Sequence, residues 1–471
     1  MTAALESPMQ IDGRGPTPGL GWLGIVRIGL VQTSLGAIVV LTTSTMNRVM
    51  VVELALPAML PGALVALHYA VQMLRPRMGH GSDVGGRRTP WIIGGMALLA
   101  LGGIGASLAT ALMGSNLPAG IALAVVSFLL IGVGVGASGT SLLTLLAKQV
   151  APDRRGAAAT IVWMMMIVGF IITAGTVGHF LDPFTPARLV TITAIVCVLA
   201  FLLTAIAVRG IEAAPGTAKV GAAAQAGAAA QPFRAALSEV WADPKARRFT
   251  VFVFMSMLAY SAQDLILEPF AGIVFGYTPG ESTKLAGIQN AGVLLGMIMV
   301  AIATSRGAGG RRRFGSLAAW TVGGCIASAA ALAALVASGL VGSGWPLRET
   351  VFLLGMSNGA FAVAAIGSMM ALAGDGPPGR EGIRMGMWGA AQAIAFGAGG
   401  FAGALLSDLA RLLSGSAVTG YTTVFALEAF LFIIAAVLAA RIGISNMSKQ
   451  EVRPRPGPVA PNRLAAGLNA R

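Results

Sequence analysis

Three carboxylates lie inside long apolar stretches of the sequence: Asp264, Glu268 and Glu428. A charged side chain in hydrocarbon is costly, so each is a candidate functional residue. Asp264 and Glu268 are four residues apart, which places them on one face of a helix, where they repel unless a proton or a cation intervenes. The pair predicts a proton-coupling site or a polar patch that binds a partner. Alternatively, the two carboxylates satisfy the backbone of a helix broken at Pro269.

A second polar group lies at the end of the first apolar stretch and consists of Asn47, Arg48 and Glu53. Arg48 can pair with Glu53 or reach across to Glu268, and either contact would close that end of the molecule. We therefore expect a structural gate there. The alternative for Arg48 alone is a solvated loop charge, which contributes little.

These residues must be positioned by membrane helices, because 56% of the 471 residues are hydrophobic and only 11% are charged. Soluble proteins have about a quarter of their residues charged. Runs of about 20 apolar residues predict spanning helices. We find twelve such runs, at 28–46, 57–74, 91–112, 120–146, 157–180, 189–208, 249–275, 285–304, 314–339, 350–373, 385–406 and 421–440. The sequence predicts an all-α integral membrane protein.

The basic residues set the predicted orientation, because Lys and Arg are retained on the cytoplasmic side. With both termini cytoplasmic, 27 of the 32 Lys and Arg residues lie inside. The outer loops then hold Arg48, Arg188, Lys284, Arg348 and Arg411. This asymmetry also accounts for the net charge of +14, so no nucleic-acid partner is implied. We expect an inner-membrane protein in contact with the lipid bilayer on all sides.

The polar stretches divide the chain into parts. A cytoplasmic tail (1–24) precedes a six-helix bundle (25–208), a cytoplasmic linker (209–248), a second six-helix bundle (249–441) and a basic cytoplasmic tail (442–471). The linker ends in a segment whose Phe233, Leu237, Val240 and Trp241 share a helical face. This pattern is typical of a helix lying on the membrane surface, although an ordinary linker fits equally well. Two isolated cysteines provide neither a disulfide framework nor a metal site.

The loop after the second run reads G-x-x-x-D-x-x-G-R-R, with Gly79, Asp83, Gly86, Arg87 and Arg88 at its fixed positions. It resembles the cytoplasmic loop motif of the major facilitator superfamily. Glycine permits a tight turn and a close helix approach, while the Asp can pair with an Arg or a helix N-terminus. The resemblance implies a major facilitator fold, with 12 transmembrane helices in two six-helix halves and a conformational latch at this loop. A positively charged turn retained only for topology is the alternative.

Two further segments resemble one family within that superfamily. Residues 43–54 (TSTMNRVMVVEL) and 259–270 (AYSAQDLILEPF) are similar to segments of the PucC/LhaA family, also called the bacteriochlorophyll delivery family. The resemblance implies a non-enzymatic assembly factor in the intracytoplasmic photosynthetic membrane of a phototrophic bacterium. It further implies light-harvesting antenna polypeptides, bacteriochlorophyll and the enzymes of its synthesis as partners.

Bacteriochlorophyll carries Mg²⁺, which can take one axial imidazole or a weaker amide ligand. His68 and Gln72 share a face of the second run, so they are our candidate pigment contacts. A lone histidine in a membrane helix is more often a hydrogen-bond partner in helix packing. Other spans contribute amides as well: Gln32, Gln289, Asn290, Asn358 and Gln392.

Three functions compete. The leading hypothesis is the assembly factor, and the alternative is a proton-coupled secondary transporter of a small solute or tetrapyrrole that uses Asp264 or Glu268. The third is a subunit of a pigment-synthesis enzyme. The chain has no D-x-x-x-D motif to hold Mg²⁺ and a prenyl diphosphate, so the third has no apparent machinery.

Overall fold

The computed structural model describes residues 20–74, 87–150, 154–212, 238, 241–304, 314–374 and 381–451. Helices dominate these residues. The first half of the chain contains α1 (Trp22–Val40), η1 (Leu41–Thr45), α2 (Met46–Arg48), η2 (Val49–Glu53), α3 (Met59–Gln72), α5 (Thr89–Met113), α6 (Leu117–Gln149), α7 (Arg155–Phe180) and α8 (Pro186–Ala207). The second half contains α11 (Pro244–Phe275), α12 (Pro279–Thr304), α13 (Leu317–Val341), α14 (Leu347–Gly374), α15 (Glu381–Ser414) and α16 (Ala417–Glu451).

Twelve helices within the described residues, with α1 to η2 counted as one, confirm the predicted all-α membrane architecture. Segments α1, η1, α2 and η2 form one continuous crossing over Trp22–Glu53. Ten helices in the described part of the chain are long and apolar enough to span a membrane, and α3 is a shorter apolar helix. The chain is therefore a multi-pass membrane protein.

Local sequence signals explain where several helices begin. The side chains of Asn116, Thr185 and Ser316 each accept a hydrogen bond, at 3.1 Å, from the backbone N–H three residues later. Proline follows in the first turn of α6 and α8, where its missing N–H has no cost. Gly276 ends α11 in the left-handed region, with φ at 71°, where glycine is the residue of choice.

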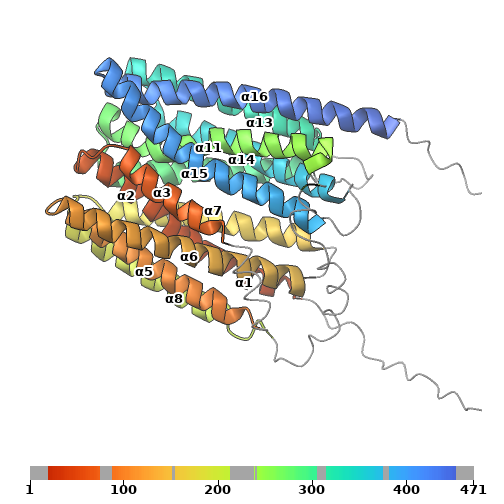
Figure 1. Cartoon of the computed structure of the whole chain (residues 1–471), viewed down its shortest axis with the longest axis horizontal. Helices are drawn as coiled ribbons and strands as arrows, with labels where there is room; N and C mark the ends of the chain where they lie inside the picture. Colours follow the sequence, from red (N-terminus) through yellow and green to blue (C-terminus); the bar gives the residue numbers. More distant parts are fainter. Residues whose placement is uncertain are drawn as a thin grey trace, which may run out of the picture.

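The helices form two groups that lie side by side along one direction. Figure 1 shows α1 to α8, coloured red to yellow, beside α11 to α16, coloured green to blue. We call these groups the N-terminal and C-terminal halves. Each has its own large apolar core, and they meet where α3 packs on α15 and α7 packs on α12. Close packing uses glycine: a Cβ on Gly296 of α12 would lie 2.0 Å from the carbonyl oxygen of Met356 in α14.

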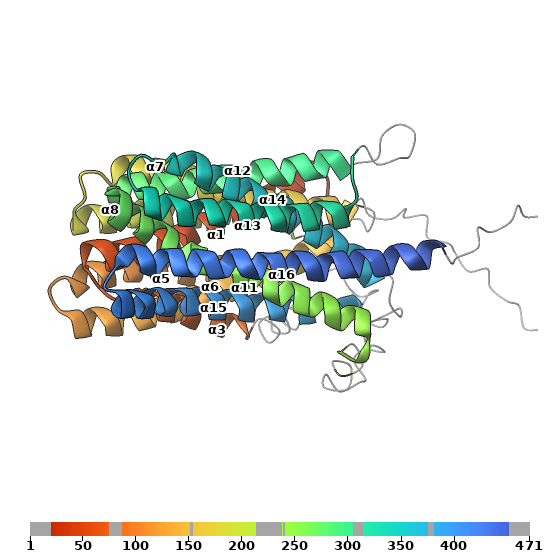
Figure 2. The same ribbon diagram turned by 90° about the horizontal axis from the view of Figure 1, so that it is seen from above.

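The two ends of the bundle differ in the chain segments they hold. Helix α1 starts and α16 finishes at one end, which we call the terminal end, and α16 extends along the whole bundle in Figure 2. The opposite end, which we call the far end, holds the turns after η2 and α11. In the predicted orientation, the terminal end is cytoplasmic.

The expectation of a broken helix at Pro269 is wrong, because α11 continues through this residue as far as Phe275. The predicted surface helix lies largely outside the described residues, although Ser238, Trp241 and Ala242 are helical. The described residues likewise exclude Gly79, Asp83 and Gly86, so the loop motif is described only at Arg87 and Arg88.

Candidate functional site

The far end of the first crossing has an unusual backbone. Two π-helical segments, η1 and η2, flank the short α2 that carries Asn47 and Arg48. In them a backbone N–H bonds the carbonyl five residues earlier, as Leu54 does to Val49 at 3.1 Å. Single π turns within helices are frequent at functional sites. Here they place Asn47 and Arg48 inside the protein.

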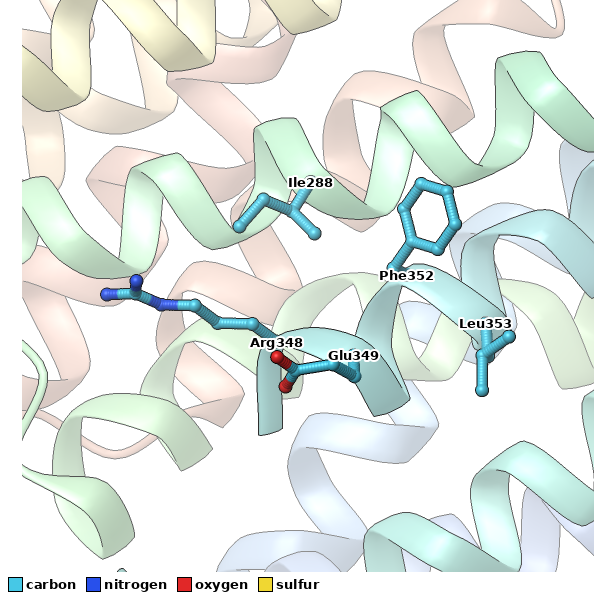
Figure 3. Close-up of a pocket in the computed structure, with 5 residues that line it drawn as sticks. All are labelled: Ile288, Arg348, Glu349, Phe352 and Leu353. Carbon is cyan, nitrogen blue, oxygen red and sulfur yellow. The ribbon is translucent and has the colours of Figure 1, made fainter. Parts of the chain in front are cut away.

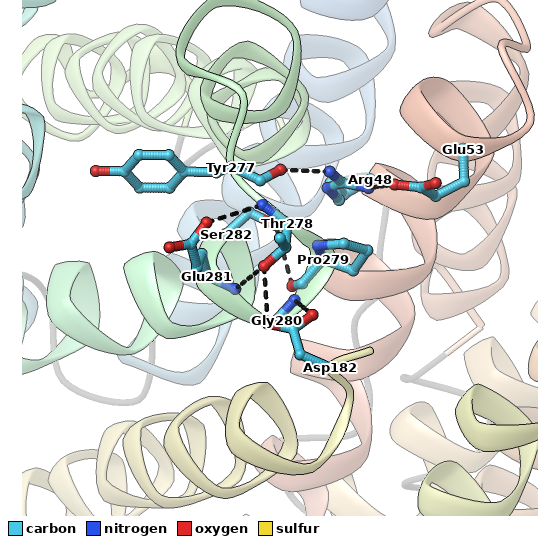
Figure 4. A network of polar contacts seen from close by, with 9 residues as sticks. All are labelled: Arg48, Glu53, Asp182, Tyr277, Thr278, Pro279, Gly280, Glu281 and Ser282. Carbon is cyan, nitrogen blue, oxygen red and sulfur yellow. Dashed lines mark hydrogen bonds and ion pairs between the residues drawn. The ribbon is translucent and has the colours of Figure 1, made fainter. Parts of the chain in front are cut away.

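Arg48 is only 2% exposed and joins the two halves. One guanidinium nitrogen forms an ion pair with Glu53. The other donates to the carbonyl oxygen of Tyr277, just after α11, at 2.7 Å, as Figure 4 shows. The interpretation of Arg48 as a solvated loop charge is therefore wrong, because the residue lies within the helical crossing and is buried.

Asn47 satisfies a backbone group that Pro269 leaves open. Proline has no N–H, so the carbonyl four residues earlier, that of Leu265, lacks its helical donor. The Asn47 side-chain amide donates to this oxygen at 2.5 Å. The sequence suggested that Asp264 and Glu268 satisfy the backbone at Pro269. At the Leu265 carbonyl, Asn47 does so instead.

Glu268 belongs to the same contact region. It is 2% exposed, and one of its oxygens accepts a hydrogen bond from the Ser44 hydroxyl. Arg48 acts on this carboxylate electrostatically, while the direct ion pair of Arg48 is with Glu53. The predicted gate residues Asn47, Arg48 and Glu53 thus meet Glu268 at the far end.

Two aspartates that the sequence reasoning did not select also tie the halves together. Asp182 follows α7 and accepts from the Thr278 hydroxyl at 2.7 Å and from the Gly280 N–H at 3.0 Å (Figure 4). Asp408 of α15 accepts from the N–H groups of Ala58 and Met59 at 3.1 and 2.8 Å.

Both aspartates receive free N–H groups at the start of a helix in the other half, where a negative charge is stabilised. Their positions at helix ends were visible in the sequence. Their targets depend on how the halves pack, so no local pattern pointed to these contacts.

At the terminal end, Arg88 makes its contacts with Glu212 of the same half. Glu212, which follows α8, accepts from the backbone N–H of Arg88 at 2.7 Å and from the N–H and hydroxyl of Thr89 at 2.9 and 2.8 Å. The Arg88 guanidinium lies 3.9 Å from the same carboxylate. Burial alone would raise the pKa of Glu212, but these hydrogen bonds and the charge of Arg88 outweigh it, so its pKa is lowered. Arg87 is exposed.

Asp264 and Glu268 lie one turn apart on the continuous helix α11, and each has a different charged neighbour. Asp264 is half-buried, and its electrostatic neighbour is Glu428 of α16, which is 1% exposed. The neighbour of Glu268 is Arg48. The three membrane carboxylates therefore form one site at the far end and another inside the C-terminal half.

His68 and Gln72 lie together as predicted, but in contact with each other. Gln72 Nε2 is 2.6 Å from His68 Nε2, and both residues are buried. In this arrangement Gln72 occupies Nε2, one of the two ring nitrogens through which an imidazole binds a metal. A pigment can take this position only if Gln72 moves.

A groove of about 360 Å³ lies on α12 and α14 near the far end. Its lining, drawn in Figure 3, consists of Ile288, Arg348, Glu349, Phe352 and Leu353. The Arg348 guanidinium also lies over the Tyr277 ring, 5.8 Å from its centre. Arg348 thus connects the groove to the loop whose carbonyl accepts from Arg48.

Solved structures share this architecture. A D-xylose–proton symporter matches with a TM-score of 0.69 at 12% sequence identity, over 89% of this chain and 97% of that one. A peptide transporter matches with a TM-score of 0.65 at 14% identity, over 91% and 97%. At such low identity the likeness concerns the fold alone, and it confirms the predicted major facilitator fold.

Sequence relatives are more specific. The Rhodobacter capsulatus protein named "Bacteriochlorophyll synthase 44.5 kDa chain" is 54% identical over 426 residues, 90% of this chain and 96% of the relative. "Protein PucC" of the same organism is 30% identical, over 88% and 91%. The family model described as PUCC protein matches residues 45–447. As predicted from the segments around Arg48 and Asp264, this chain belongs to the PucC family.

Proposed function

We propose that this protein is a membrane assembly factor for light-harvesting complexes in a phototrophic bacterium, and that it binds or delivers bacteriochlorophyll to antenna polypeptides. Residues 43–54 and 259–270, which carry the family resemblance, lie far apart in sequence yet contact each other through Ser44, Asn47 and Glu268. A family signature that forms one structural site is evidence that the site serves the family's common task.

The protein acts without catalysing a reaction in this proposal. It holds antenna polypeptides or pigment against a membrane-embedded surface, and the gate at Arg48 controls whether the far end opens. The name of the 54%-identical relative refers to pigment synthesis, which fits a place beside the enzymes that make bacteriochlorophyll. Its membrane is the inner or intracytoplasmic photosynthetic membrane, with both termini cytoplasmic.

His68 and Gln72 are the proposed pigment contacts. Their mutual hydrogen bond holds the imidazole in place while no pigment is present, and release of Gln72 would free Nε2 for Mg²⁺. The His68 imidazole would hold the pigment through its Mg²⁺, and the metal would supply the Lewis-acidic centre for this contact. Replacing His68 with Ala should therefore reduce the bacteriochlorophyll that copurifies with the protein.

Complementation tests the proposed function. The gene is expressed in a Rhodobacter capsulatus strain that lacks the 54%-identical relative, and antenna absorption and bacteriochlorophyll content are measured. Wild-type protein should restore both, whereas the Asp264→Asn, Glu268→Gln double variant should not, because neutral isosteres keep the shape and remove the charge. Glu349→Gln changes an exposed carboxylate and serves as the matched control.

Respiratory growth should be unaffected in every strain. If the deletion strain kept normal antenna and pigment levels but lost uptake or export of an unrelated solute, the protein would be a proton-coupled transporter instead.

A further inference from the structure

The C-terminal half contains three deeply buried polar side chains with atoms that lack a partner among the described residues. Glu428 of α16 is 1% exposed, and both of its carboxylate oxygens lack a hydrogen-bond partner. Gln263 of α11 is fully buried, with both amide atoms unpartnered, and buried Asn358 of α14 has an unpartnered Nδ2. Such atoms destabilise a protein unless something satisfies them.

Ring contacts place Asn358 and Glu428 at the same level. The rings of Phe361 in α14 and Phe432 in α16 are 5.7 Å apart. Asn358 precedes Phe361 by three residues, and Glu428 precedes Phe432 by four, so each lies on the same helix face as its ring, one turn away. Both helices run from the far end to the terminal end. Asn358 and Glu428 therefore both lie about one turn nearer the far end than the two rings.

Gln263 approaches the same region from α11. Its backbone N–H group acts on the Glu428 carboxyl, although no hydrogen bond of regular geometry joins the two. Nearer the far end, Phe270 of α11 contacts Phe425 of α16, with ring centres 5.1 Å apart. Because these helices are antiparallel, moving from this contact toward the terminal end reaches Gln263 on one helix and Glu428 on the other.

The free atoms match a protonated carboxyl better than a metal ion. A hard cation takes about six oxygen ligands, whereas the free oxygens here are two from Glu428 and one from Gln263. The free Nδ2 of Asn358 and Nε2 of Gln263 are donors and would repel a cation. The Ser328 hydroxyl donates to Asn358 Oδ1 at 2.7 Å, which keeps Nδ2 as the available group. A carboxylic acid needs one donor and one acceptor, and both kinds are present.

We propose that Glu428, Gln263 and Asn358 form an internal proton-binding site that is loaded through Asp264. Asp264 is the charged group that acts on Glu428 among the described residues. Among the described residues, other titratable side chains in the same apolar core are Tyr260 of α11, Cys325 of α13 and Tyr421 of α16. These three are neutral near pH 7 in their ordinary state, so the two carboxyls carry the titration.

Asp264 lies between this site and side chains that pack at the interface of the halves. It is only half-buried and interacts with Tyr260. The Tyr260 ring contacts Phe396 of α15 at 5.8 Å, and Phe396 contacts Tyr69 of α3 in the other half at 5.6 Å. In the loading step, the O–H bond of Asp264 breaks and an O–H bond forms on Glu428. Asp264 is left as a carboxylate, which regains a proton from water.

Infrared spectroscopy of the full-length protein in lipid vesicles tests the site. Wild-type protein at neutral pH should show a protonated-carboxyl C=O band that shifts in D₂O. Glu428→Gln should remove this band, and the exposed Glu349→Gln control should keep it. Asp264→Asn should keep the band but slow its shift in D₂O at least tenfold, because the entry route is blocked. Circular dichroism of each variant checks that it is folded.

Three results would overturn the proposal: a band that persists in folded Glu428→Gln, an ionised Glu428 in wild-type protein, or an unchanged exchange rate in Asp264→Asn. Stabilisation of wild-type protein by sodium chloride but not by choline chloride, lost in Glu428→Gln, would replace the proton with a sodium ion. If Glu428→Gln does not fold, Glu428→Asp is measured, and its shorter side chain should shift the band. The proposal is independent of pigment assembly, because the spectrum is read without an antenna.

Discussion

Two buried arginines at opposite ends of the bundle show how differently the ends are built. Arg48 pairs with Glu53 and also donates to Tyr277 in the other half. Arg88 pairs with Glu212, and both belong to the N-terminal half. The bond from Arg48 to Tyr277 must break if the halves separate at the far end, whereas the pair of Arg88 with Glu212 can persist when the halves move as rigid bodies.

The comparison separates a contact that controls conformation from a contact that stabilises one half. At the far end, Asp182, Asp408 and Asn47 add further bonds between the halves. At the terminal end, the described bonds of Arg27 to the carbonyls of Ala207 and Arg209 stay within one half. Substitutions at the far end should therefore change both conformation and stability, whereas those at the terminal end should change stability alone.

The largest effect is expected for Arg48→Gln, which removes the cation from a buried site. Its partner Glu53 is exposed, so the main loss is the buried charged hydrogen bond to Tyr277, about 1.5–3 kcal/mol of unfolding free energy, and the far end should open. Labelling of a cysteine at Thr45, which is 1% exposed, should accelerate in a variant whose Cys197 and Cys325 are replaced by Ala. Arg88→Gln should leave this labelling rate unchanged. Equal acceleration by both variants would remove the distinction between the ends.

A smaller effect is expected for Glu212→Gln at the terminal end. Losing a charged cap at the start of α5 should lower the unfolding free energy by about 1–2 kcal/mol. Because the pKa of Glu212 is lowered on folding, its stabilisation is present above the unfolded value of about 4.3. It is lost as pH falls through the lower folded value. Denaturation from pH 7 to acid should therefore show a steeper loss for wild type than for the variant, with no change in labelling at Thr45.

Asp408→Ala should cost about 1 kcal/mol, since it uncaps α3. Unlike Glu212→Gln, it should also speed labelling at Thr45, because the lost bonds cross between the halves. Asp408→Asn, which retains an acceptor oxygen, should lie between wild type and Ala. A labelling rate that does not follow this order would show that the cap is local to α3.

The smallest effect on folding is expected for Asp83→Asn in the loop motif. Acidic residues contribute little to topology, so membrane insertion should be normal while the conformational latch weakens. Protease protection of the loops on both sides measures insertion. Failure to insert would assign the motif a structural role. A separate topology check labels cysteines at Lys284 and Gly310, which we expect on opposite sides of the membrane.

Much of the fold could be predicted from the sequence because hydropathy constrains membrane helices strongly. The run at 249–275 corresponds to α11, and that at 189–208 to α8, with differences of a few residues at the start. The first run, 28–46, was too short, because the polar TSTMNR segment interrupts hydropathy while the helix continues to Glu53. Hydropathy cannot distinguish a polar turn from a polar segment buried against another half.

The sequence selected candidate residues at the far end but not the contacts that they make there. Helical spacing grouped Asp264 with Glu268, but it did not identify Glu428 and Arg48 as the charged groups that interact with them. Helical spacing gives the face of one helix and carries no information about which neighbouring helix covers it. For the same reason Glu212, far from Arg88 in sequence, could not be chosen as its partner.

The π turns on either side of Arg48 make this segment tolerant of one change in chain length. Each wide turn accommodates one residue more than an α-helix would. Deleting a residue from 41–45 would therefore let the wide turn close to an ordinary α-helical turn, while Arg48 keeps its direction toward Tyr277. A deletion in the regular helix α1, where one residue corresponds to about 100° of rotation, should instead turn Arg48 away from Tyr277, although it lies farther from the guanidinium.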